Sequence, residues 1–474
     1  MHTKGEKIAS SKQILPLPIT AFMATLMFNQ NTWMKDDLIS ATPRAFLYPL
    51  FVAFLYYLCR KSLFPCLFTI VLIGLFYPQY VFICAGILVV RLWNWHGGKF
   101  RFSQQKHDYI FCGIGLGVAF LVMLPYALKT SEFAPIISVA QAKQLPEFLP
   151  RGRSSFFKED LFDYLWSGRS GIFSASLFTP VTACFGLLLP FLMLFRSKFS
   201  LLRKTTEEII ILPQILLVAI GMFIAAHLFL FKLHLPSRYT GYSFRILLTI
   251  SAAITFTAIF EAILSTNYRK NNFFRYFKQI LSFLFIAVVW LALLFYYPLF
   301  TDNLPKTSYQ TGSVPTLYEF FQQQPKDTLI ASITEEVSNL PTFSQRSILI
   351  GREYAIPYHF GYYSEFRQRV LDLIQAQYSE NLGDVKTFIQ KYGVDFWLLE
   401  SGAFTPKYSK KNPLLRQYHR SNLNQDKLVK ITKNIFQNLQ QGNIPALSKT
   451  IPNCTVAKVK DYIVLDAKCI VAKS

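Results

Sequence analysis

The sequence lacks the short motifs that mark several common classes of soluble enzyme. It contains no phosphate-binding GxxxxGK[ST] loop, no HExxH zinc signature, no CxxC pair and no GxSxG nucleophile turn. Interpretations as a soluble ATPase, a zinc protease or a serine hydrolase therefore have no support. The chain also has no internal repeat, and no small-residue cleavage site follows its first apolar run, so we expect no cleavable signal peptide.

Acidic residues are scarce, whereas apolar and aromatic residues are abundant. The 474 residues include 27 Asp and Glu against 49 Lys and Arg, and they are 52% hydrophobic and 16% aromatic. A net charge of +22 is often a sign of nucleic-acid binding, but here the basic residues fall in short clusters between apolar runs. That distribution predicts a polytopic α-helical membrane protein with the lipid bilayer, and no nucleic acid, as its partner.

The apolar runs predict about nine transmembrane helices, since a helix needs roughly 20 mostly apolar residues to span a bilayer. The candidate spans are 14–28, 45–59, 63–77, 80–93, 109–128, 172–195, 209–231, 244–264 and 280–300. The first four are short, and the first also contains Pro16 and Pro18.

Basic residues favour one side of the predicted topology. They precede the first span and follow the second, fourth, sixth and eighth, and these positions all share one face if every span is real. The positive-inside rule makes that face cytoplasmic. We therefore expect a multi-pass protein of the cell inner (plasma) membrane with a cytoplasmic N-terminus. Loops 29–44, 129–171 and 232–243, and everything after about residue 300, then lie outside.

The sequence predicts two domains: a transmembrane domain over 1–300 and an extracytoplasmic soluble α/β domain over 301–474. Helices are expected over 314–324, 361–379, 385–393 and 424–441, and strands over 328–333, 347–352 and 394–400. Their alternation predicts a partly parallel sheet.

The cysteines fall into two groups. Two β-rich runs flank Lys460-Asp461 as a predicted hairpin, and Cys454 and Cys469 bracket it. Outside the membrane these two can form a disulfide; the alternative is two buried thiols. The other five cysteines lie in apolar runs and are expected to pack as small apolar residues.

A polar stripe marks the start of the eighth span. If the helix begins at Pro236, then Arg238, Tyr242, Arg245 and Thr249 share one helix face. Arginines at membrane depth are costly and usually functional, and their planar fork suits phosphate. The stripe therefore predicts a lipid-phosphate site made of Arg238, Tyr242 and Arg245. The alternative is that the arginines reach lipid headgroups by snorkelling.

Two outer segments carry further candidates. Adjacent Asp36 and Asp37 have the chemistry to hold a divalent cation or to act as a general base, although paired acids are common on loops. The segment 142–171 mixes aromatics with Glu147, Arg153 and Asp163, a composition that suits the faces and hydroxyls of sugars and equally an interfacial aromatic belt. We predict Asp36 and Asp37 as catalytic residues and Glu147, Arg153 and Asp163 as substrate-binding residues.

A third polar and aromatic segment lies in the outer domain. Residues 351–369 offer binding candidates or simply a solvated helix face. These candidates are His359, Glu353, Glu365, Arg367 and Arg369.

Taken together, these features resemble the GT-C superfamily of membrane glycosyltransferases. The local phrases DLISATPRAF, GLFYPQY, LPEFLPRGRSSFF, LPSRY and KYGVDFWLLE are similar to those of large bacterial membrane proteins of this kind. The resemblance implies a polyprenyl-phosphate sugar donor, Asp36 or Asp37 as base or metal ligand, and Arg238 on the lipid phosphate. One departure is the short first outer loop, which leaves open that the chain lacks an N-terminal portion. A transporter or flippase for lipid-linked glycans, and a non-catalytic scaffold, remain as alternative functions.

Overall fold

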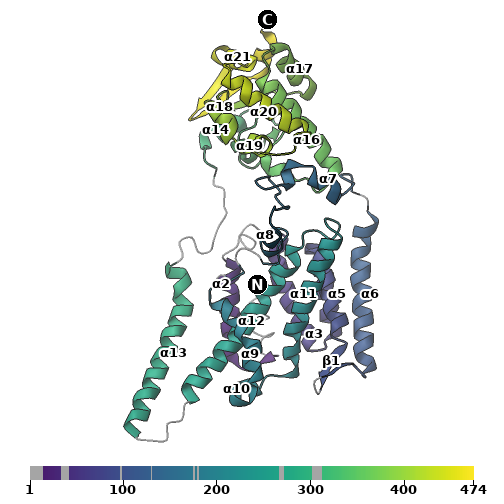
Figure 1. Ribbon diagram of the computed structural model, residues 1–474, viewed down its shortest axis with the longest axis vertical. Helices are drawn as coiled ribbons and strands as arrows, with labels where there is room; N and C mark the ends of the chain where they lie inside the picture. The colour runs from purple at the N-terminus through teal and green to yellow at the C-terminus, as the bar shows by residue number, and fades with distance from the viewer. Residues whose placement is uncertain are drawn as a thin grey trace. The chain divides into compact units, whose positions relative to one another are not determined.

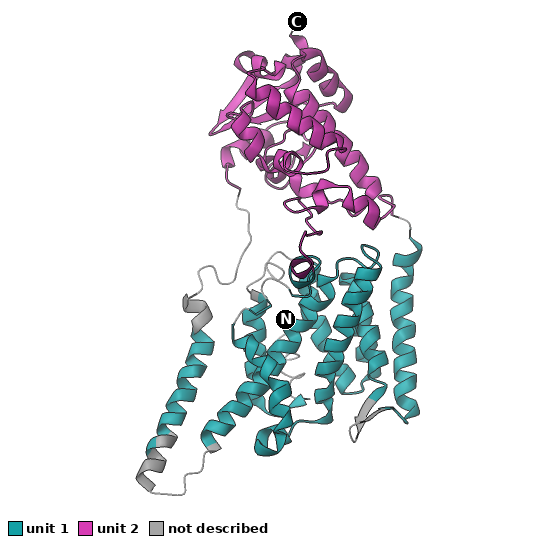
Figure 2. Ribbon diagram, in the orientation of Figure 1, with its two compact units in different colours: residues 1–129, 165–309 teal, residues 130–164, 310–474 magenta. Residues whose placement is uncertain are grey.

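The computed structural model describes residues 14–33, 42–96, 99–129, 131–173, 177–178, 181–265, 272–300 and 312–473. The chain forms two compact units, each built from two separate segments (Figure 2). Unit 1 contains residues 1–129 and 165–309, and unit 2 contains residues 130–164 and 310–474. This division differs from the one expected at residue 300, because the segment 130–164 packs with the C-terminal residues.

Unit 1 is helical, and most of its long helices run side by side (Figure 1). A hairpin in its described part pairs β1 (Trp93–His96) with β2 (Lys99–Phe102). Its longer helices are α2 (Pro18–Trp33), α3 (Arg44–Cys59), α4 (Leu63–Phe76), α5 (Val81–Val90), α6 (Lys106–Leu128), α11 (Ile211–Leu228), α12 (Ser237–Ser265) and α13 (Asn272–Phe300). Its shorter helices are η1 (Pro78–Tyr80), η3 (Val181–Leu188), α9 (Leu189–Leu194), η4 (Arg196–Lys198), α10 (Ser200–Arg203) and η5 (Glu207–Ile210).

Within the described residues, three helices are long and apolar enough to cross a membrane: Lys106–Leu128, Glu207–Leu228 and Ser237–Leu264. Five further apolar helices are shorter, so the predicted nine crossings stay a prediction. The three long helices differ in burial. In the third, 67% of the most apolar window is buried inside the protein, against 22% in the first. Helix α12 is therefore the centre of unit 1, where it packs against α2, α11 and η3.

Prolines explain where two predicted spans differ from the structure. The first span was expected from residue 14, but α2 begins at Pro18, since proline fits the first turn of a helix and not its interior. The predicted span 172–195 is not one continuous α-helix. Its described part contains the 3₁₀ helix η3 and then α9, with Pro190 in the first turn of α9. Pro190 lacks the N–H that would continue an α-helix from the preceding turn.

Unit 2 is an α/β domain, as predicted, around a five-stranded mixed sheet. Its strand order is β4-β3-β5-β7-β6, parallel among the first three and antiparallel among the last three. The strands are β3 (Leu329–Ala331), β4 (Ser347–Ile348), β5 (Phe396–Glu400), β6 (Thr455–Val459) and β7 (Tyr462–Asp466). The predicted strand 347–352 is confirmed only over its first two residues, and the hairpin at Lys460-Asp461 is confirmed.

The helices of unit 2 include all four that the sequence predicts, together with several short ones that it does not. The predicted helices are α14 (Pro315–Gln322), α16 (Phe360–Tyr378), α17 (Leu382–Tyr392) and α20 (Lys427–Gln440). The others are α7 (Val139–Lys143), η2 (Pro146–Phe148), η6 (Glu336–Asn339), α15 (Leu340–Phe343), η7 (Arg352–Tyr354), α18 (Pro406–Lys411), α19 (Pro413–His419), α21 (Ala446–Cys454) and α22 (Ala467–Ala472), with α8 (Leu161–Trp166) at the boundary with unit 1.

The cysteines behave as the sequence predicts. A disulfide joins Cys454, at the end of α21, to Cys469 in α22. It therefore ties the two helices that flank the terminal hairpin. The remaining cysteines are free thiols, four of them buried and Cys184 half-buried.

Candidate functional site

The polar stripe lies on α12, as predicted. Pro236 immediately precedes the helix, and the backbone N–H of Tyr239 donates to its carbonyl at 3.2 Å. Arg238 and Tyr242 are one turn apart, and the Arg238 Nη1 donates to the Tyr242 hydroxyl at 3.3 Å. The α12 helix thus holds the two groups as a connected pair in its first turns.

Arg245 lies deeper in unit 1 and has a different environment. Its side chain is 0% exposed, and its Nη1 donates to Oδ1 of Asn31 at 2.7 Å and to the Asn31 carbonyl at 3.4 Å. Asn31 belongs to α2, so Arg245 links two helices. The sequence predicts that Arg245 binds phosphate together with Arg238, and this prediction requires a correction. Direct phosphate binding does not fit it, because the guanidinium is enclosed by protein.

Tyr242 is part of an aromatic cluster that supports Arg238. Its side chain is 2% exposed, and its ring centroid lies 5.4 Å from that of Tyr48 and 5.5 Å from that of Tyr77. Edge-on aromatic contacts of this kind restrict the ring. The Tyr242 hydroxyl is therefore held in a fixed position, where it accepts the hydrogen bond from Arg238. Tyr242 is thus a positioning residue for Arg238.

Three half-buried arginines gather around the start of α12. Arg44 and Arg238 both interact electrostatically with Tyr77, and Arg169 and Arg238 both interact with His234. Arg169 is held there because its carbonyl accepts a hydrogen bond from the Ser237 N–H at 3.4 Å. Concentrated positive charge in a partly desolvated place, beside phenols, suits an anion with several oxygens such as phosphate.

Two histidines, His227 and His234, lie in this region. The Nε2 of His227 lies 2.9 Å from the Ser170 carbonyl, next to Arg169. His234 lies in the connection between α11 and α12 with a left-handed backbone (φ 66°). Burial, with further effects from Arg238 and Arg169, lowers the pKa of His234 to about 4. At neutral pH the ring is therefore uncharged and adds no positive charge of its own.

The His234 pKa predicts a pH-dependent stability. Between pH 6.5 and 4 the unfolded chain binds a proton at His234 that the folded chain does not, so the free energy of unfolding falls as pH falls. We expect a loss of about 1.6 kcal/mol from pH 6.5 to pH 5, because the slope rises toward about 1.4 kcal/mol per pH unit as the unfolded histidine becomes fully protonated. Reversible denaturation in detergent measures it. The control is His234→Asn, which tolerates the left-handed backbone and has no titrating ring. An equally steep slope in His234→Asn would contradict the assignment.

The predicted catalytic pair Asp36 and Asp37 lies outside the described residues. No group of three or more His, Cys, Asp or Glu suited to a metal ion occurs in the part of the chain that the structure describes. The candidate site is therefore built from its basic and phenolic groups.

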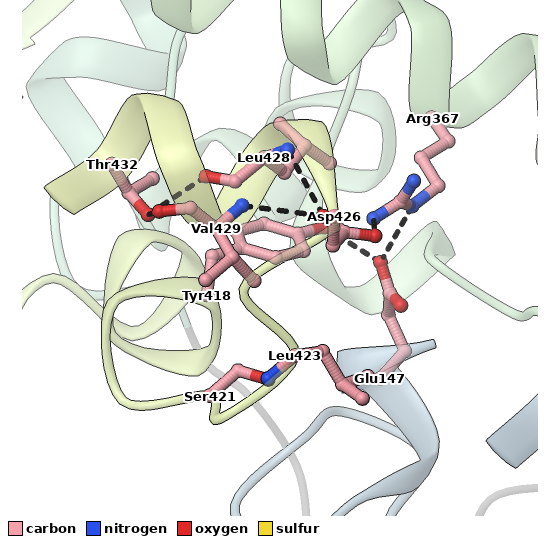
Figure 3. Close-up of polar contacts among 9 residues, drawn as sticks. All are labelled: Glu147, Arg367, Tyr418, Ser421, Leu423, Asp426, Leu428, Val429 and Thr432. Atoms are coloured by element: carbon pink, nitrogen blue, oxygen red, sulfur yellow. Dashed lines mark hydrogen bonds and ion pairs between the residues drawn. The ribbon is translucent and has the colours of Figure 1, made fainter. Parts of the chain in front are cut away.

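The prediction that Glu147 binds substrate requires a correction, because its side chain does not face solvent. Its side chain is 0% exposed, and Oε1 accepts from Arg367 Nε at 3.2 Å and from the Tyr418 hydroxyl at 2.9 Å. Arg367 also pairs with Asp426, whose other carboxylate oxygen caps α20 through two backbone N–H groups (Figure 3). Glu147 thus fastens the segment 130–164 inside unit 2, which excludes direct contact with a substrate in this conformation.

The charges around Arg367 oppose the effect of its burial. Burial lowers the pKa of Arg367, but Glu147, Tyr418 and Asp426 outweigh that effect and hold the pKa above its ordinary value. The guanidinium therefore stays charged as the counterion of a buried carboxylate.

The other two predicted substrate-binding residues make different contacts. Arg153 forms an ion pair with Glu353, and its backbone N–H donates to Gln417 Oε1 at 3.2 Å. Asp163 is exposed on α8, where its backbone N–H donates to Asp160 Oδ2 at 2.8 Å. Their role in substrate binding stays a prediction.

The sequence did not connect Arg44 and Arg169 to Arg238. Each arginine lies at the end of an apolar segment. Arg44 is the first residue of α3, and Arg169 lies close to a glycine on either side, in a turn between two apolar segments. Only packing brings them to the start of α12.

Comparison with known proteins adds little. No family model matches the chain, and no curated protein matches it. Among solved structures, it is similar to the crystal structure of the Archaeoglobus fulgidus oligosaccharyltransferase tethered with an acceptor peptide containing the NVT sequon, with a TM-score of 0.37 and 12% identity. The match covers 91% of this chain and 59% of that chain, so this chain spans less than two thirds of that protein's length.

Proposed function

We propose that the chain is an integral membrane glycosyltransferase-like protein that uses a polyprenyl-phosphate-linked sugar on the extracytoplasmic side of the inner membrane. The observation that carries the proposal is the position of Arg238. It stands at the start of a long apolar helix, bonded to Tyr242 and close to two further arginines. The resemblance of the sequence to GT-C enzymes supplies the donor class.

In this proposal each group has a separate task. Arg238, with Arg44 and Arg169, holds the phosphate of the donor and stabilises the charge that it gains as it leaves. The positive end of the α12 dipole adds to this effect. Asp36 or Asp37 takes the proton of the acceptor hydroxyl. The same carboxylates would hold a divalent cation, which would make that hydroxyl more acidic. The acceptor oxygen then attacks the anomeric carbon, and the bond from that carbon to the phosphate oxygen breaks.

Sugar transfer in proteoliposomes tests the proposal. The purified full-length protein, supplied with polyprenyl-phosphate sugars and membrane acceptors, is expected to release polyprenyl phosphate and to glycosylate the acceptor. Asp36→Asn with Asp37→Asn is expected to abolish transfer, and Arg238→Gln to reduce it by at least tenfold.

Two results would contradict the proposal. Movement of the lipid-linked glycan between leaflets without transfer would show the flippase alternative, and neither movement nor transfer would leave the scaffold alternative. Transfer that is unchanged in both variants would overturn the assigned residues.

A further inference from the structure

Unit 2 contains a cavity of about 590 Å³ at the end of its sheet. Its walls include Glu353, which follows β4, and Glu400, the last residue of β5. Four residues that follow β3 complete this side of the cavity: Glu335, Glu336, Ser338 and Asn339. The cavity therefore lies beyond the carboxyl ends of the three parallel strands. Tyr462 joins it from β7, because it pairs with Glu400 across the antiparallel part of the sheet.

The strand order places the cavity where ligands commonly bind in sheets of this kind. From β3 the chain goes to β4 on one side, and it then crosses to β5 on the other side of β3. In open sheets with parallel strands, ligands bind beyond the carboxyl ends of the strands at the point where the connections diverge in this way. The cavity occupies that point between β3 and β5.

The lining disfavours the phosphate ligands that are common at such points. The loop after β3 carries Glu335 and Glu336 where a phosphate-binding loop would present glycine N–H groups. Glu335 and Glu353 face arginines, Arg352 and Arg153 respectively. The ion pairs among the described residues of unit 2 involve neither Glu336 nor Glu400. Glu336 accepts hydrogen bonds from Ser313, Tyr318 and Asn339, so Glu400 is the carboxylate that this lining offers to a ligand.

Phenols and amides complete the lining. Asn412 is 4% exposed and is held by its bonds to the Ile333 carbonyl at 2.9 Å and the Tyr408 hydroxyl at 3.0 Å. Burial, and then the Glu400 carboxylate, raises the pKa of Tyr408 and of Tyr462, so both phenols stay protonated as donors. Lys411 adds one cation to the lining.

We infer that this cavity binds a glycan segment of the acceptor substrate. Sugar hydroxyls would donate to Glu400, in the short hydrogen bonds that carboxylates form with hydroxyls. The tyrosines offer both a hydroxyl and an apolar ring face to a sugar. This inference rests on the proposed function, which supplies the reason for a glycan, but its site is separate from Arg238.

A binding experiment on the full-length protein in nanodiscs tests the inference. Labelled protein is applied to an array of neutral, amino and acidic oligosaccharides, and the best neutral ligand is then titrated in solution by calorimetry. Wild type is expected to retain neutral oligosaccharides, and Glu400→Gln to weaken the calorimetric affinity about tenfold through loss of a charge-assisted hydrogen bond. Tyr462→Phe, which removes only a hydroxyl, is the second variant and is expected to weaken binding without unfolding. Glu380→Gln, an exposed site away from the cavity, is the matched control and is expected to bind as wild type does.

Three outcomes would overturn the inference. Wild type would retain no neutral oligosaccharide, or Glu400→Gln and Tyr462→Phe would both bind the oligosaccharide with the affinity of wild type. The third is displacement of the sugar by an equal concentration of spermidine, which has amines and no hydroxyls. Arg238→Gln separates this inference from the proposed function. Glycan binding that survives in Arg238→Gln while transfer is absent even in wild type would refute only the proposed function. Arg238-dependent transfer without glycan binding would refute only the inference.

Discussion

Replacing Arg367 with methionine is expected to lower the free energy of unfolding of unit 2 by about 3–5 kcal/mol, because the change leaves a buried carboxylate without its counterion. Glu147 is 0% exposed, and Arg367 is its charged partner within the described network. Methionine keeps most of the length of the side chain, so lost packing contributes little. Hydrogen exchange of the β5 amides in the full-length protein measures the change, since β5 lies in the middle of the sheet.

Two controls separate the charge effect from a general effect of mutation. Arg369→Met removes an exposed arginine from the same helix, and we expect a change below about 0.5 kcal/mol. Adding Glu147→Gln to Arg367→Met removes the buried charge and is expected to recover part of the loss, which a double-mutant cycle quantifies. A double variant no more stable than Arg367→Met would show that the unpaired carboxylate is not the cause.

Replacing Arg238 with glutamine is expected to weaken the binding of polyprenyl phosphate by about 10- to 100-fold, since a hydrogen bond to a charged group contributes about 1.5–3 kcal/mol. Glutamine keeps a donor and loses the charge. The affinity of Arg238→Lys is expected to lie between those of wild type and Arg238→Gln, because lysine retains the charge but not the planar fork of donors. Equilibrium binding of labelled polyprenyl phosphate to the protein in nanodiscs measures the affinities.

The matched control for Arg238 is Arg203→Gln. Arg203 is an exposed arginine at the end of α10 in the same unit, and its removal lowers the net charge of the protein equally. We expect Arg203→Gln to bind as wild type does. Equal weakening in both variants would mean that binding reflects overall charge and not a site at the start of α12.

For the stripe on α12, helical periodicity predicted which residues share a face but not how deeply each is buried. Spacing of three and four residues placed Arg238, Tyr242 and Arg245 on one face, and the structure has them there. Spacing did not reveal that Arg245 is enclosed beside Asn31 while Arg238 is only half-buried. That difference depends on α2, which lies more than 200 residues away in the chain.

The short helices of unit 2 show the opposite case, in which a local signal was present and not used. Helices α18 and α19 each begin with a polar cap and a proline, Thr405-Pro406 and Asn412-Pro413. A capping residue followed by proline is a start signal for a helix. Both helices are too short for their apolar periodicity to be recognised.

By itself, the sequence determined the features that depend on neighbours along the chain: the apolar helices, the start of α12 after Pro236, the alternating elements of unit 2 and the hairpin that Cys454 and Cys469 bracket. These follow from local hydropathy, from backbone geometry and from short spacings. The tertiary structure decided which charges meet. It buried Glu147 against Arg367, 220 residues away, and it gathered Arg44, Arg169 and Arg238 around one helix end. The physical reason is that burial and electrostatic partners are set by distance in space, and packing brings together charges that the sequence keeps far apart.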